Sequence, residues 1–112
     1  MEKDFIFIIS QDDKKTELIK QSIEDEYKLF FVQSETDAKS MYPHLCNNIK
    51  IVFIDHSSPD INALELLQSL RKISPIPEFI VHSEFPNIHL VVECIKNGAT
   101  DFFHHQIKQI KH

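Results

Sequence analysis

Three aspartates stand just beyond apolar runs of the sequence, where carboxylates can do chemistry. Asp12 and Asp13 follow the run FIFII by two residues, and Asp55 directly closes the run IVFI. A carboxylate at the end of a buried strand is costly unless it is solvated, paired or bound to a metal. Such positions suit a Mg²⁺ ligand or a phosphoryl acceptor, but aspartates also cap helices and turns. From position alone, Asp55 has either a functional or a capping role, and Asp12 and Asp13 also suit a helix start.

Histidines lie at the same predicted edge, and imidazole suits Zn²⁺, Ni²⁺ or Cu²⁺. They are His56, His82, His104 and His105. His104 and His105 are adjacent in the chain, and adjacent strand residues point to opposite faces of a sheet, so these two cannot easily share one ion. We therefore interpret the histidines as surface residues rather than as a native metal site.

The elements that must position these residues follow from apolar runs that alternate with helical patterns. Strands are expected at residues 5–9, 28–32, 51–54, 78–82 and 100–103. Helices are expected at 14–26, from a Ser34 cap to a break or kink at Pro43, at 62–72, and at 88–97 with Gly98 just past the end. The inward positions are Leu18, Ile19, Ile23, Ala38, Met41, Leu45, Leu64, Leu67 and Leu70. Continuously apolar strands separated by helices predict a doubly wound, three-layer α/β sandwich with a parallel sheet, which reacts at the carboxyl ends of its strands.

The composition excludes several classes of protein. The chain has 112 residues, which predicts one domain over residues 1–112, and its net charge of -5 argues against non-specific nucleic-acid binding. No apolar run approaches the ~20 residues that a membrane helix needs. Gly98 is the only glycine, which excludes a P-loop and a GxGxxG turn. Cys46 and Cys94 lack ligand spacing, so we expect two reduced, mostly buried thiols in a cytoplasmic protein without a signal peptide.

Several short motifs, in this order and at this spacing, resemble the receiver domain of bacterial two-component response regulators over nearly the whole chain. The resemblance is carried by IVFID with Asp55 at its end, Pro59 four residues later and Ala63 eight residues later. It continues in FIVHS, where Ser83 takes the place of the family's hydroxyl residue, and in KNGATDFF, where Phe102 takes the place of its switching aromatic. The resemblance implies a flavodoxin-like sheet of five parallel strands in the order 2-1-3-4-5.

The resemblance also implies a function, namely phosphoryl transfer to an aspartate with Mg²⁺ as cofactor. The residues implied are Asp55 as phosphoacceptor and Mg²⁺ ligand, Asp12 as a second Mg²⁺ ligand, Ser83 and His105 around the phosphoryl group, Phe102 as the switching aromatic, and Ser10, Gln11 and Pro59 at the edge of the site. The implied partner is a protein, either a sensor histidine kinase or a downstream effector, or a second copy of the chain. Neither a membrane nor direct nucleic-acid binding is expected.

Two departures from the family pattern concern its charged residues. With Leu18-Ile19 at the family's paired apolar positions of the first helix, the acid pair of the family falls on Ser10-Gln11, and only Asp12 keeps a carboxylate nearby. A longer first strand would instead make Asp12-Asp13 the pair, and this register stays open, although the end of the apolar run at Ile9 favours the first.

The position of the family's lysine, after the fifth strand, is held by His105, with Gln106 in place of the usual proline. A histidine is largely neutral at pH 7 and replaces a fixed positive charge poorly. Residues 106–112 allow only a shortened fifth helix, with Ile107 and Ile110 able to pack on the sheet. In the family, the fourth helix, the fifth strand and the fifth helix form the usual partner face, which a shortened fifth helix would reduce. The domain is either naturally short or cut from a longer protein.

These observations leave three hypotheses. The first is an atypical receiver with an eroded phosphorylation site that acts mainly through protein–protein interaction. The alternative is a receiver that still accepts a phosphoryl group on Asp55 with Mg²⁺, by a transfer that its own residues catalyse and not as an enzyme acting on other substrates. A flavodoxin-like cofactor domain shares the layer order, but the sequence lacks the glycine-rich phosphate loop that a flavin would need.

Overall fold

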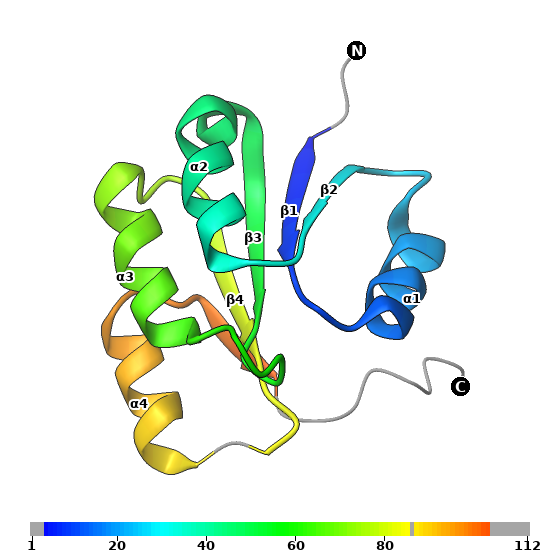
Figure 1. The fold of residues 1–112 in the computed structure, drawn as a ribbon. Coiled ribbons are helices and arrows are strands. Elements are labelled where there is room, and N and C mark those ends of the chain that lie inside the picture. The colour runs from blue at the N-terminus through cyan, green and yellow to red at the C-terminus, as the bar shows by residue number, and fades with distance from the viewer. Residues whose placement is uncertain (1–3, 86, 104–112) are drawn as a thin grey trace.

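The computed structural model describes residues 4–85 and 87–103 (Figure 1). Parallel strands form one sheet in the order β2-β1-β3-β4-β5, which confirms the predicted order and fold class. The strands are β1 (Phe5–Ile9), β2 (Lys28–Val32), β3 (Ile49–Asp55), β4 (Glu78–His82) and β5 (Asp101–Phe103), and the helices are α1 (Asp13–Ile23), α2 (Glu35–Leu45), α3 (Ala63–Ile73) and α4 (Ile88–Lys96). The predictions for His104, His105, Gln106 and the fifth helix lie outside the described residues.

Helices cover both faces of the sheet, with α2, α3 and α4 on one side and α1 on the other (Figure 1). Because strand side chains alternate between the faces, Ile54 joins the larger core cluster under α2, α3 and α4, whereas Phe53 joins the cluster under α1. The same alternation turns the next residue, Asp55, to the α1 side. Asp55 is in register with His82 on the neighbouring strand β4. The last residues of the two strands therefore lie side by side.

Each of the helices α1 to α4 begins with a side chain that accepts a hydrogen bond from the first turn. The capping residues are Asp12, Ser34, Asn62 and Asn87. Helix α4 ends in a Schellman arrangement, in which Gly98 N–H donates to Ile95 and Ala99 N–H donates to Cys94. Gly98 has a φ of 105°, which confirms the left-handed residue predicted there.

The predicted inner faces of the helices are largely confirmed, and the boundaries differ in a few places. Ala38, Leu67 and Leu70 are buried, while Met41, Leu45 and Leu64 are partly buried against the same cluster. Helix α1 ends at Ile23 rather than near residue 26, and β3 begins at Ile49 rather than Ile51. Of the two alternatives predicted at Pro43, a break or a kink, the break is wrong, because α2 continues to Leu45 and a 3₁₀ turn (Cys46–Asn48) follows. A proline near the end of a helix removes only one backbone donor.

The two cysteines are free and buried, as the sequence predicts. Both belong to the larger core cluster, Cys46 after α2 and Cys94 in α4. Among the described helices, none is long and apolar enough to cross a membrane.

Candidate functional site

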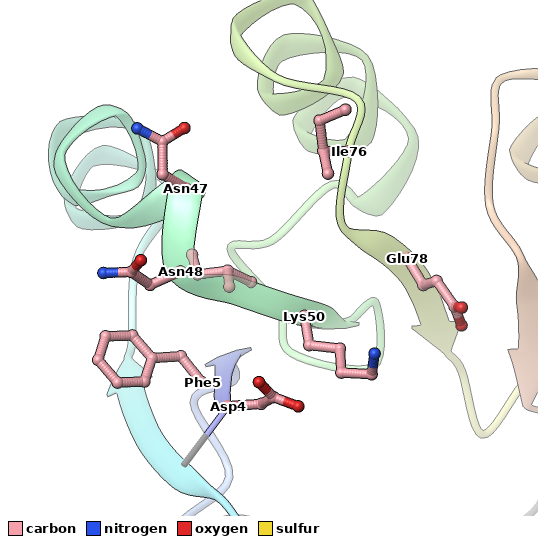
Figure 2. A pocket seen from close by; sticks show the side chains of 8 residues that line it. Asp4, Phe5, Asn47, Asn48, Lys50, Ile76 and Glu78 are labelled. Atoms are coloured by element: carbon pink, nitrogen blue, oxygen red, sulfur yellow. The ribbon is translucent and has the colours of Figure 1, made fainter. Parts of the chain in front are cut away.

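Two of the surface hollows among the described residues lie at opposite ends of the sheet. The larger, of about 380 Å³, lies at the amino ends of the strands and is lined by exposed residues such as Asp4, Lys50 and Glu78 (Figure 2). The smaller, of about 340 Å³, lies at the carboxyl ends and borders the buried residues Lys15 and Asp55. Parallel sheets bind ligands and react at the carboxyl ends of their strands. We therefore take the smaller hollow, which holds the buried charges, as the candidate site.

Asp55 is the centre of this site, and its carboxylate is fully buried. Its Oδ2 atom accepts hydrogen bonds from Ser10 Oγ at 2.7 Å and from Ser58 Oγ at 3.1 Å. Its Oδ1 atom accepts a hydrogen bond from the Ser57 backbone N–H at 3.0 Å. Both carboxylate oxygens are thus already occupied by donors from the ends of β1 and β3.

A lysine of α1 supplies the charge that balances this carboxylate. Lys15 Nζ lies 3.1 Å from Oδ1 and 3.0 Å from Oδ2 of Asp55, and 3.3 Å from Glu84 Oε2. The Lys15 residue is only 4% exposed, which is rare for a lysine unless its ammonium is paired. The pairing with both oxygens of Asp55 and with Glu84 satisfies this requirement.

The local sequence explains why Lys15 reaches the site. Asp12 accepts a hydrogen bond from the Lys15 backbone N–H at 3.1 Å and so sets the first turn of α1 directly after β1. Side chains of a helix tilt toward its amino terminus, and the amino terminus of α1 lies at the carboxyl end of β1. A long side chain in the first turn of α1 therefore extends back toward Asp55.

The two histidines of the described edge have structural roles. His82 is fully buried, its ring stacks on Phe53 with 6.0 Å between centroids, and its Nδ1 lies 3.4 Å from Asp55 Oδ1. The interpretation of His82 as a surface residue is wrong, because its register beside Asp55 turns it toward the α1 side. His56 Nδ1 accepts a hydrogen bond from Ala63 N–H at 3.0 Å, at the start of α3. Among the described residues, no cluster of histidine, cysteine and acidic side chains has the geometry of a metal site.

Electrostatic interactions in the site shift the pKa of two groups. Burial by itself raises the pKa of Asp55, but hydrogen bonds from His82, Ser10 and Lys15 and the Lys15 charge outweigh burial and hold the pKa well below its ordinary value of 3.8. Asp55 is therefore ionised at neutral pH. Burial lowers the pKa of His56, against a smaller opposing effect of the Asp55 charge. His56 therefore remains neutral at pH 7 and can accept the hydrogen bond from Ala63.

Known proteins share this arrangement of strands and helices. The family model described as "Response regulator receiver domain" matches residues 6–111. The chain belongs to the response regulator receiver domain family. The curated relative "Chemotaxis protein CheY" of Thermotoga maritima is 36% identical over 52 residues, a match that spans 46% of this chain and 43% of that protein.

Solved receiver structures share the fold at low sequence identity. A response regulator receiver domain from Clostridium thermocellum has a TM-score of 0.84 at 21% identity and covers 94% of this chain and 84% of its own. A CheY-like receiver domain from Methanospirillum hungatei has a TM-score of 0.84 at 18% identity, covering 96% and 85%. The CheX-CheY-BeF₃-Mg²⁺ complex from Borrelia burgdorferi matches with a TM-score of 0.84 at 18% identity, covering 94% and 80%.

The residues after β1 that the receiver resemblance assigns to the site make different contacts. Ser10 contacts Asp55, but the Gln11 amide turns to Asp60, with Nε2 3.4 Å from Oδ2. The Asp12 carboxylate caps α1, and Asp13 is the first, exposed residue of that helix. Neither Gln11 nor Asp12 is hydrogen-bonded to Asp55, so the carboxylate that a second metal ligand would supply is directed at the helix.

The remaining receiver positions surround the same end of the sheet. Ser83 follows β4, is buried, and its Oγ accepts a hydrogen bond from Phe85 N–H at 3.3 Å. Pro59 lines the hollow beside Asp55. Phe102, on β5, pairs in register with Val81 and is half-buried against the larger core cluster. Asp55 also contacts three residues that no sequence motif indicated, Lys15, Ser57 and Ser58.

Proposed function

We propose that this receiver domain is atypical and acts mainly through protein–protein contacts, with Asp55 serving as a structural anion rather than as a phosphoacceptor. The single observation that supports the proposal most is the buried Lys15 ammonium, 3.0 and 3.1 Å from the two oxygens of Asp55. The partner that receiver chemistry suggests is a protein, either a sensor histidine kinase or a downstream effector, in the cytoplasm. The domain is not an enzyme under this proposal.

The contacts of Asp55 oppose each requirement of phosphoryl transfer. A carboxylate must attack with a free oxygen, but both oxygens already accept hydrogen bonds from Ser10, Ser57 and Ser58. The attack also needs a cation that offsets the charge of the incoming phosphoryl group. The cation present is the Lys15 ammonium, which is bound to the nucleophile itself and stabilises its ground state.

The same contacts do not fit Mg²⁺. This ion takes oxygen ligands at about 2.0–2.1 Å and usually one or two carboxylates. Asp55 is the carboxylate placed for it, and an ion there would face the Lys15 ammonium at close range. Ser10 donates its hydroxyl to Asp55, and the Asp12 carboxylate accepts from the helix backbone. We therefore propose that Mg²⁺ binds weakly at this site.

The competing candidate is a receiver that still accepts a phosphoryl group on Asp55. The observation in its favour is the hollow of about 340 Å³ beside Asp55, whose lining also includes Gln11, Pro59 and Phe85. For transfer to occur, Lys15 would have to leave Asp55 and pair with the phosphoryl oxygens instead. The two candidates therefore differ in whether the ammonium stays on the carboxylate.

Beryllofluoride and acetyl phosphate separate these candidates. We expect the protein with millimolar Mg²⁺ to gain no mass from acetyl phosphate and to show no beryllofluoride-dependent amide shifts at Ser10, Asp55 or Ser83. The dispersed amide spectrum of the same sample shows that the protein is folded. The matched control is Asp55→Asn, which lacks the nucleophile. An adduct on the wild-type protein that is missing from this variant would overturn the proposal.

A further inference from the structure

We infer that the ion pair between Lys15 and Glu84 holds the start of the β4–α4 connection against the Asp55 site, so that no phosphoryl group is needed to position it. The segment concerned is Ser83 to Phe85, directly after β4 (Glu78–His82). This inference deepens the proposed function and rests on it, because it concerns how the same site is regulated. It assigns to Lys15 a second role, in addition to balancing the charge of Asp55.

Glu84 is attached to the site through both its side chain and its backbone. Its Oε2 atom lies 3.3 Å from Lys15 Nζ, and its N–H donates to Ser57 Oγ at 2.8 Å. Ser57 in turn donates its own N–H to Asp55 Oδ1 at 3.0 Å. The two contacts therefore connect one residue of the β4–α4 connection to α1 and to the loop after β3.

The residue after Glu84, Phe85, is the one whose position depends on the contacts of Glu84. Phe85 is 84% exposed, and its N–H donates to Ser83 Oγ at 3.3 Å. The Ser83 hydroxyl oxygen therefore already accepts a hydrogen bond from within the β4–α4 connection. The attachment of Glu84 thus determines where the chain leaves the sheet on its way to α4.

The strength expected of this pair lies between those of buried and surface pairs. The Lys15 side chain is 3% exposed and the Glu84 side chain is 24% exposed, at an N–O distance of 3.3 Å. The pair Lys96–Glu93 on α4 has side chains that are 68% and 49% exposed, at 3.9 Å. Exposed pairs contribute little, whereas breaking a buried pair strongly destabilises its surroundings. Glu93 is therefore a matched control for Glu84.

Amide hydrogen exchange of full-length Glu84→Gln and Glu93→Gln tests the inference. We expect exchange of the Glu84-position and Phe85 amides to be about tenfold faster in Glu84→Gln, through local opening. The amides of β1 and β3 should keep their wild-type rates, which shows that the variant remains folded. In Glu93→Gln, the amides at positions 84 and 85 should exchange at wild-type rates.

The outcomes distinguish this inference from the proposed function. Unchanged exchange at positions 84 and 85 in Glu84→Gln would overturn the inference and leave the proposed function untouched. Equal acceleration in both variants would overturn it as well, because the effect would then not depend on the Lys15 pair. Beryllofluoride binding to the wild-type protein would overturn the proposed function, whatever the exchange rates are.

Discussion

Replacing Lys15 with methionine removes the ammonium from the Asp55 site but keeps the serine donors that bind the Asp55 carboxylate. Methionine has a similar length and a similar helix propensity, so α1 is little affected. The backbone bond from Lys15 N–H to Asp12 does not depend on the side chain. The change removes the ammonium from both Asp55 and Glu84, and a double-mutant cycle with Asp55→Asn separates the Asp55 part.

The expected loss in the free energy of unfolding depends on the hydrogen bonds that Asp55 keeps in Lys15→Met. Breaking a buried ion pair by removing one partner costs about 3–5 kcal/mol, because it leaves an uncompensated charge. Asp55 would still accept hydrogen bonds from Ser10, Ser57 and Ser58, which offset part of this cost. We therefore expect Lys15→Met to lower the free energy of unfolding by about 3 kcal/mol. Adding Asp55→Asn to Lys15→Met should recover about 2 kcal/mol, because no fully buried charge then remains unpaired.

Urea unfolding of the wild-type protein, the two single variants and the double variant gives this double-mutant cycle. Lys39→Met is the control, because Lys39 pairs with Glu35 at 3.9 Å and its side chain is 42% exposed. We expect the control to change stability by at most about 0.5 kcal/mol. If Lys15→Met behaves like the control, or if the single effects of Lys15→Met and Asp55→Asn simply add, Lys15 does not balance the charge of Asp55.

Two further predictions concern acid and the single glycine. The pKa of Asp55 lies below its ordinary value of 3.8, so the folded state binds fewer protons than the unfolded state; the stability this provides is present above about pH 4 and lost as pH falls further. Urea midpoints at pH 7 and pH 3 should thus differ less in Asp55→Asn than in the wild type, and an equal difference would contradict this origin. Gly98→Ala should lower the free energy of unfolding by about 1–3 kcal/mol, because φ is 105° and the new Cβ would collide with the Arg71 side chain. Thermal unfolding measures this loss, and an unchanged midpoint would refute it.

The fold could be predicted because its signals are local and repeated. Continuously apolar strands, helix caps such as Ser34 and the single left-handed position at Gly98 each fix an element by short-range physics. The resemblance to receivers then supplied the strand order, which periodicity alone does not determine. The predicted helix boundaries were less accurate, as at Pro43. Whether a helix ends where a proline removes one backbone hydrogen bond depends on the packing around that turn.

The site was less predictable, because its decisive residue gives no motif. In the sequence, Lys15 is one of two adjacent lysines, and a lysine in the first turn of a helix usually lies in solvent. Its burial depends on the position of α1, which Asp12 sets by capping the helix. The signal that could have revealed it is the absence of acidic residues at Ser10 and Gln11. A buried carboxylate at Asp55 without acids at these two positions needs one positive charge rather than a divalent ion.

Charge balance connects these substitutions physically. A receiver site with two acids after the first strand and a phosphoacceptor holds three carboxylates, which favour a divalent cation. Here the positions after β1 are the neutral Ser10 and Gln11, so the buried charge comes from Asp55 alone, with Glu84 partly in solvent. One ammonium offsets that charge, and because Lys15 is part of the chain its effective concentration does not depend on the medium. Placing acids at positions 10 and 11 without removing Lys15, or removing Lys15 without placing acids there, would leave the site unbalanced in opposite directions.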